Sequence, residues 1–129
     1  MDRDIELSRI FPVDSSQLFQ DWLSSIGHSA FTGSPAEIEP RIGGHFSAWD
    51  GYIWGITLEL EPDHRIVQSW RTTEFPTEAS DSLIELKFEQ VNDGTKLTIV
   101  HSNIPDDQAE GYEAGWEDYY FKPMREYYG

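Results

Sequence analysis

The sequence contains no cysteine in 129 residues. This absence excludes disulfide bonds, thiol nucleophiles and metal sites built from thiolates. The chain also lacks any run close to the ~20 apolar residues that are needed to span a bilayer. Its first residues, Met1 to Asp4, alternate in charge and do not resemble a secretory signal. We therefore expect a cytoplasmic protein.

Positive charge is also scarce. Nine Lys and Arg residues face 24 Asp and Glu residues, which gives a formal net charge of −15. Such a chain repels phosphate backbones and anionic lipid headgroups, so nucleic-acid and membrane partners are disfavoured. Two interpretations of the acidity remain open: adaptation to high salt, and an ordinary acidic surface. A melting temperature that does not change when molar salt is removed would exclude the first.

Aromatic residues are abundant, at 14% of the sequence, and hydrophobic residues reach 38%. This composition argues against disorder despite the high charge. A chain of this length can bury about two thirds of its unfolded surface, which is enough for one core. No repeat, linker or low-complexity segment divides it, so we expect one domain over residues 1–129.

The N-terminal third predicts a strand and a helix. A strand from Ile5 should end at Phe11, because Pro12 cannot donate to a sheet. An N-cap at Asp14, or at the serines that come after it, then precedes an amphipathic helix that we expect to end at Gly27. The apolar positions of this helix are Leu18, Phe19, Trp22, Leu23 and Ile26.

The remainder predicts an antiparallel meander and a closing helix. A short extended piece at 36–39 precedes strands near 45–49, 52–60, 65–72, 82–88 and 97–101, which are separated by tight turns. In the second of these strands, Trp54 falls in the alternating apolar set. After Pro105, residues from Tyr112 to Tyr127 carry an apolar stripe at helical spacing, which Pro123 should kink or restart. The expected class is α+β.

Several segments resemble one known family. They are residues 31–46 (FTGSPAEIEPRIGGHF), the glycines at positions 51 and 55, residues 65–71 (RIVQSWR), Ile104-Pro105, and residues 115–121 (GWEDYYF). Together they resemble the family named for the activator of the heat-shock protein 90 ATPase. This family lies within the START-related SRPBCC superfamily. The resemblance spans residues 4–128 and implies a helix-grip fold, a curved antiparallel sheet wrapped on a long C-terminal helix.

The resemblance also implies a partner. It lies with the C-terminal module of the two-domain activators, which contacts the chaperone. The N-terminal module of those proteins, with the motif that drives most of the ATPase stimulation, has no counterpart among these residues. The resemblance therefore implies chaperone binding, in a co-chaperone-like role in the stress response, rather than the full activator function.

No arrangement of reactive residues points to catalysis. His28, His45, His64 and His101 lack metal-ligand spacing, and we expect them to be structural. Gly43-Gly44 lacks the context of a phosphate loop. Asp50 suits a hairpin turn, Glu59 suits a solvent face, and no serine lies in a nucleophile elbow. We therefore predict no catalytic, cofactor-binding or metal-binding residues, and a protein that is not an enzyme.

Aromatic side chains remain as the candidate binding residues. We expect five of them to meet between the sheet and the closing helix: Trp54, Trp70, Phe88, Trp116 and Tyr120. They could fill the core completely, or they could line a cavity for an apolar ligand. Gly111 and Gly115 would leave one side of the closing helix without side chains.

Three functions therefore stay open. The first is a non-enzymatic chaperone-binding module, whose acidic surface would suit a basic patch on the partner. The alternative is a binder or carrier of a small hydrophobic ligand. The third, a cyclase or hydrolase, would require a polar group inside the cavity, and the sequence nominates none.

Overall fold

One antiparallel sheet of seven strands forms the body of the protein in a computed structural model that describes residues 3–129. Its order is β1-β7-β6-β5-β4-β3-β2, and every neighbouring pair is antiparallel. The strands are β1 (Arg3–Phe11), β2 (Glu37–Ile38), β3 (His45–Ala48), β4 (Ile53–Glu61), β5 (Arg65–Thr72), β6 (Ser82–Val91) and β7 (Gly94–Ile104). The predicted meander is confirmed, and β5 has the predicted bounds.

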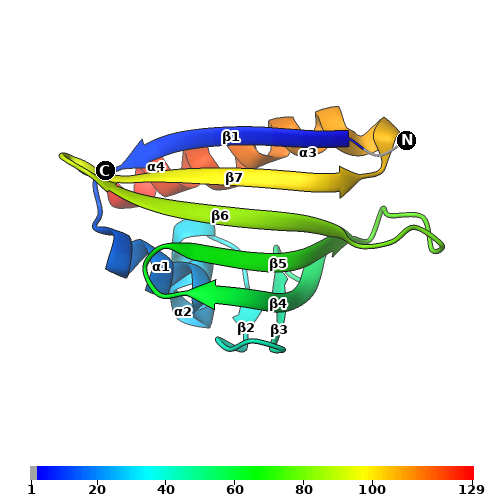
Figure 1. The fold of residues 1–129 in the computed structure, drawn as a ribbon, viewed down its shortest axis with the longest axis horizontal. Helices are drawn as coiled ribbons and strands as arrows, with labels where there is room; N and C mark the ends of the chain where they lie inside the picture. The colour runs from blue at the N-terminus through cyan, green and yellow to red at the C-terminus, as the bar shows by residue number, and fades with distance from the viewer. Residues whose placement is uncertain (1–2) are drawn as a thin grey trace.

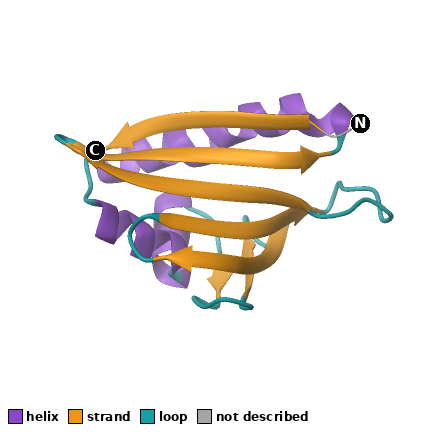
Figure 2. Ribbon diagram, in the orientation of Figure 1, coloured by secondary structure: helices purple, strands orange, loops and turns teal. Residues whose placement is uncertain are grey.

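Helices cover one face of this sheet (Figure 1). Two short helices, α1 (Ser15–Leu23) and α2 (Ser25–Thr32), lie behind β5 and β4, and the C-terminal helix runs behind β1 and β7. That last helix comprises η1 (Asp106–Gln108), α3 (Ala109–Trp116), η2 (Glu117–Phe121) and α4 (Lys122–Tyr128). Figure 2 shows the curved sheet with its helices on a single side. The α+β class and the helix-grip architecture are therefore confirmed.

The N-terminal helix differs from its prediction. Asp14 caps α1 as expected, because its side chain accepts a hydrogen bond from the backbone N–H of Gln17 at 2.8 Å. The chain then breaks at Ser24, whose hydroxyl caps α2 by accepting from the N–H of Gly27 at 3.0 Å. The expected end at Gly27 is wrong, since α1 ends at Leu23 and Gly27 lies inside α2, which ends before Gly33 at φ 78°. Ile26 is 84% exposed and does not join the buried face.

The C-terminal helix changes its winding next to Pro123. Residues Glu117–Phe121 form a π-helical turn, closed by a hydrogen bond from the N–H of Lys122 to the carbonyl of Glu117. Pro123 lacks an N–H and cannot pair with the carbonyl four residues earlier, so a wider turn accommodates it. The helix restarts as α4 at Lys122, which confirms that Pro123 interrupts the α-helical pattern.

Strand β4 presents the opposite face from the one expected. Ile53, Gly55 and Thr57 are buried, whereas the side chain of Trp54 is 39% exposed. A register shift between Thr57 and Glu59 then reverses the alternation, so that Leu60 packs against the core. A β-bulge produces such a reversal because it adds one residue to one strand. The apolar residues that alternate along this part of the sequence therefore lie on two different faces of the sheet.

The core lies between the sheet and the helices. Its fully buried side chains include Phe11 and Leu97 from the sheet and Phe121 and Met124 from the C-terminal helix. The rings of Phe11 and Phe121 lie 5.9 Å apart, which ties β1 to the end of that helix. Within residues 3–129, no helix is both long and apolar enough to cross a membrane.

Two glycines provide a test of this packing. A Cβ at Gly55 would lie 1.9 Å from the backbone oxygen of Ser69, whereas a Cβ at Gly111 would have no neighbour within 4 Å. We expect Gly55→Ala to lower the free energy of unfolding by more than about 2 kcal/mol, because the backbones of β4 and β5 must separate. Gly111→Ala should raise it by up to about 1 kcal/mol through helix propensity. Urea denaturation measures the free energy of unfolding of both variants. Equal changes would contradict the close approach of β4 and β5 at Gly55.

Candidate functional site

A partly open cavity of about 730 Å³ lies between the sheet and α3. This volume is within the range of small-molecule sites. Most of its wall is aromatic. The lining residues are Trp49, Tyr52, Ile53, Trp70, Glu74, Asp107, Gln108, Gly111, Tyr112, Gly115, Trp116, Tyr119 and Tyr120.

Three buried rings form what we call the floor of the cavity. Trp70 comes from β5, and Trp116 and Tyr120 come from successive turns of the C-terminal helix. The ring centroids of Trp70 and Trp116 are 5.7 Å apart, and those of Trp116 and Tyr120 are 4.9 Å apart. Each ring is at most 4% exposed. Contacts of this kind fix ring positions, since aromatic pairs favour tilted and perpendicular arrangements at these distances.

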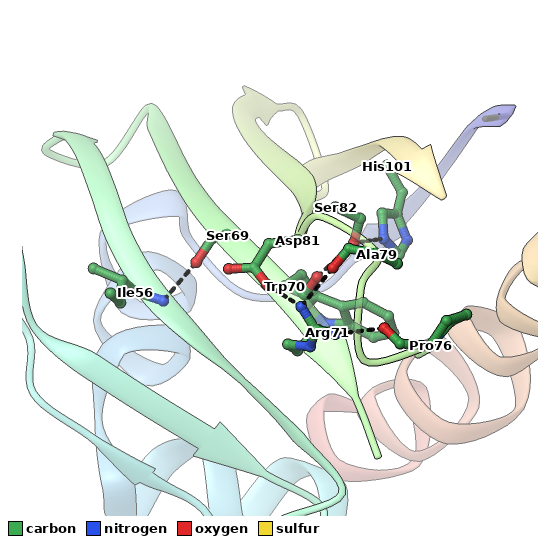
Figure 3. A network of polar contacts seen from close by, with 9 residues as sticks. All are labelled: Ile56, Ser69, Trp70, Arg71, Pro76, Ala79, Asp81, Ser82 and His101. Carbon is green, nitrogen blue, oxygen red and sulfur yellow. Dashed lines mark hydrogen bonds and ion pairs between the residues drawn. The ribbon is translucent and has the colours of Figure 1, made fainter. Parts of the chain in front are cut away.

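A chain of hydrogen bonds holds two of the floor residues. The indole N–H of Trp116 donates to His101 Nδ1 at 3.0 Å. His101 Nε2 lies 2.8 Å from Ser82 Oγ, which donates to the backbone oxygen of Trp70 at 2.6 Å. Because indole can only donate, Nδ1 must accept, and the imidazole proton therefore resides on Nε2. Figure 3 shows the part of this chain formed by His101, Ser82 and Trp70.

The second buried histidine holds the third floor residue. His28 Nδ1 lies 2.9 Å from the backbone oxygen of Trp22, and His28 Nε2 lies 2.8 Å from the hydroxyl of Tyr120. A carbonyl can only accept, so Nδ1 carries the proton and the Tyr120 hydroxyl donates to Nε2. The two histidines thus adopt opposite tautomers, and each is fully paired as a neutral ring.

Burial keeps both imidazoles uncharged. Removal from water lowers the pKa of His28 to about 4 and the pKa of His101 to about 3, from an ordinary value of 6.5. At His28 the hydrogen bond to the Trp22 carbonyl partly opposes this shift. Burial also raises the pKa of the Tyr120 phenol, so the whole floor is neutral at physiological pH.

Polar groups form what we call the rim network. The Tyr52 hydroxyl donates to the Glu74 carboxylate, and the Gln108 amide donates to the Glu74 backbone oxygen at 2.9 Å. The Tyr112 hydroxyl donates to Gln108 Oε1 at 2.6 Å, and it lies 2.6 Å from the hydroxyl of Thr72. The network joins β5 and the loop after it to the start of the C-terminal helix.

The structure brings three of the five predicted binding residues together: Trp70, Trp116 and Tyr120. The prediction for Trp54 is wrong. Its position on β4 directs the side chain away from the helices, next to Arg71 of the adjacent strand. Phe88 is buried but does not line the cavity. Its ring packs edge-on against Phe19 of α1, at 5.5 Å. The space between the sheet and the helices is therefore packed near Phe19 and Phe88 and open near Trp70 and Tyr112.

Sequence reasoning missed several lining residues. Tyr112 and Tyr119 belong to the helical stripe, but nothing in the pattern separates them from its core positions. Trp49 and Tyr52 flank the turn at Asp50-Gly51, and only the fold brings this turn over α3. His101 did carry a signal, because it alternates with Leu97 and Ile99 on the buried face of β7.

The Ser82–His101 pair is not arranged for nucleophilic catalysis. Ser82 and His101 are both fully buried, and Ser82 commits its proton to a backbone carbonyl. His101 donates to this hydroxyl, whereas a general base would accept from it. Among residues 3–129, no group of three or more His, Cys, Asp or Glu side chains is placed to hold a metal ion.

Comparison with known proteins identifies relatives. The family described as "Activator of Hsp90 ATPase homolog 1-like protein" matches residues 13–129. The human "Activator of 90 kDa heat shock protein ATPase homolog 1" is 31% identical over 125 residues. The crystal structure of an HSP90 activator from Plasmodium falciparum superposes with a TM-score of 0.83 at 26% identity, covering 94% of this chain and 92% of that one.

Other similarities extend only to the fold. The solution structure of CalU16 from Micromonospora echinospora gives a TM-score of 0.81 at 21% identity, covering 98% of this chain and 65% of that one. The lengths also differ among sequence relatives. The alignment with the human protein covers 97% of this chain but 37% of the human sequence.

The buried histidines predict a loss of stability in mild acid. The unfolded chain binds protons at these residues near pH 6.5, and the folded chain does so only near pH 4 and pH 3. Because the unfolded state binds more protons between these values, the free energy of unfolding should fall by roughly 2–3 kcal/mol from about pH 7.5 to about pH 5.5. Denaturant titrations at each pH measure this slope.

Variants assign the slope to particular residues. His101→Gln should flatten it by about 1 kcal/mol over the same interval, since one of the two protons is removed. The same substitution at the exposed His64 is the matched control. An imidazole NMR titration provides an independent measurement. Equal flattening in both variants, or buried rings that protonate near pH 6.5, would contradict the assignment.

Proposed function

Because this chain belongs to the family of Activator of Hsp90 ATPase homolog 1-like proteins, we propose that it acts as a non-catalytic binding partner of an Hsp90-type chaperone. The observation that carries the proposal is the extent of the family match, which includes the whole sheet after β1 and all of the helices. The similarity to the Plasmodium falciparum activator over nearly the full length of both chains supports it. Chaperone binding follows more directly from this similarity than ATPase stimulation does, because the chain spans 37% of the human relative.

The surface charge suits such a partner. With a net charge of −15, the chain would associate faster with a basic surface, and salt would screen this attraction. Several arginines are already paired on the protein, including Arg65 with Glu59, Glu61 and Glu85. These pairs leave many other carboxylates available to the partner.

Calorimetric titration of an Hsp90-type chaperone with the chain tests this function. We expect saturable binding at about 50 mM salt that weakens several-fold at about 300 mM salt. Chaperone ATPase activity serves as a second readout. The absence of binding at the lower salt concentration would overturn the proposal, and binding that does not depend on salt would remove the electrostatic part of it.

The cavity favours a second function, the binding or transport of a small molecule. A floor of buried rings with a volume of about 730 Å³ above it can cover most of a small ligand. Hydrogen bonds hold the side chains of Trp116 and Tyr120 and the backbone of Trp70 in place, so we treat the site as preformed. Preformed sites bind more tightly, because less ordering accompanies binding.

Filling the cavity tests this second function. Gly111 lines the cavity, and its Cβ position is open, so Gly111→Phe should occupy the space without a clash. The exposed Ala114 on the same helix offers Ala114→Phe as the matched control. We expect the neutral dye N-phenyl-1-naphthylamine to bind with enhanced fluorescence to the wild type and the control, and at least about tenfold more weakly to Gly111→Phe.

The same pair of variants separates the two functions. Chaperone binding should survive Gly111→Phe, because that function does not depend on the cavity. Dye binding that is equal in all three proteins would overturn the small-molecule function while leaving the chaperone proposal intact.

A further inference from the structure

The lining of the cavity contains two perpendicular ring pairs. Trp70 and Tyr112 have centroids 5.0 Å apart and an interplanar angle of 83°. Trp49 and Tyr119 have centroids 5.4 Å apart and an angle of 70°. Adjacent perpendicular rings form the walls of aromatic cages, in which several ring faces surround one cation. The lining of the cavity therefore has the aromatic composition of such a cage.

The charged groups of the cavity lining are all negative. Glu74 and Asp107 line the cavity and are exposed at its mouth, and no lysine or arginine belongs to the lining formed by residues 3–129. The nearby Arg71 is occupied elsewhere, since it pairs with Asp81 at 2.7 Å and donates to the backbone oxygens of Ala79 and Pro76 (Figure 3). Its charge is thus directed into the loop before β6.

The rim network commits the protons of both phenols to partners within the protein. Tyr52 donates its proton to Glu74, and Tyr112 donates its proton to Gln108. Burial raises the pKa of the Tyr112 phenol, and the negative charges of Glu74 and Asp107 add to this shift. Burial also raises the pKa of the Tyr52 phenol, so both phenols stay protonated at neutral pH.

We propose that the cavity binds a small organic cation, an ammonium ion with apolar substituents, whose charge lies against the aromatic walls and the two rim carboxylates. This inference rests on the small-molecule function proposed above and names its ligand class. The apolar substituents pack on the floor of Trp70, Trp116 and Tyr120. An anion would meet two carboxylates and few available donors. A neutral apolar ligand would gain nothing from Glu74 and Asp107.

One lining residue contains a buried polar atom without a partner. Trp49 lines the cavity, and its indole N–H is buried without a hydrogen-bond partner among residues 3–129. A buried donor of this kind is costly when it is unpaired.

Two probes of nearly the same shape test the proposal. Phenyltrimethylammonium carries a positive charge, and tert-butylbenzene is its neutral carbon analogue. We expect the cation to bind about tenfold more tightly, as measured by ligand-observed NMR titration, because cation–π attraction and the rim carboxylates act on the cation alone. The anionic benzenesulfonate should bind more weakly than either probe.

A charge-matched pair of double variants locates the effect. Glu74→Gln with Asp107→Asn removes both rim charges, and the new amide at position 74 can still accept from Tyr52. This variant should reduce the preference for the cation to about threefold or less. The control, Glu78→Gln with Glu110→Gln, removes two exposed charges outside the cavity lining and should retain the full preference.

Each outcome decides the question. If tert-butylbenzene binds as tightly as the cation, the cation proposal is overturned and the small-molecule function stands. If neither probe binds to the wild type, the cation proposal is overturned, and the dye measurement alone decides the small-molecule function. If both double variants lose the preference equally, the general field of the protein attracts the cation, and the assignment to Glu74 and Asp107 is wrong.

Discussion

The position of the cavity depends on one buried chain of hydrogen bonds, from the Trp116 indole through His101 and Ser82 to the backbone of Trp70. It connects α3 with three adjacent strands, β7, β6 and β5. Every member is a donor to the next, so the chain has one direction and one tautomer. Buried polar groups are costly unless all of them are paired, and here the pairing also fixes the ring of Trp116 and the backbone of Trp70. The same bonds therefore satisfy the interior and shape the site.

The cavity stays open because the large buried side chains of the C-terminal helix lie at its other end. Phe11, Phe121 and Met124 fill the space where α4 meets β1, while Gly111 and Gly115 keep α3 slim above the floor. The π-helical turn before Pro123 lies between these two regions. An extra residue in one turn rotates the later part of the helix, so Tyr120 and Phe121 are both buried at successive positions, one toward the cavity and the other toward β1. Pro123 thus helps to separate the packed core near α4 from the open cavity beside α3.

Local chemistry accounts for the features that the sequence could predict. The turn at Asp50-Gly51, the cap at Asp14 and the restart at Pro123 each arise from the conformational limits of a few neighbouring residues, and all three occur. The face of Trp54 could not be predicted, because a bulge between Thr57 and Glu59 depends on how β4 pairs with β5. Phe88 was correctly expected in the interior, but alternation along a strand does not say which part of the interior a side chain enters. For the same reason the sequence could not identify Trp49 and Tyr52 as lining residues. Only the path of the folded chain brings them to the cavity.

The charge of the protein and the charge of the cavity have different consequences. A net charge of −15 spread over a hydrated surface attracts every cation weakly and is screened within about 10 Å at moderate salt. At the cavity, Glu74 and Asp107 lie beside aromatic rings that would exclude water from one side of the proposed cation. Electrostatic attraction grows as water is excluded, so two carboxylates at this mouth can select a ligand that the other carboxylates only attract. Selectivity in this fold would then arise from where the aromatic residues gather, and the acidic surface would supply the long-range attraction for both a basic protein partner and a small cation.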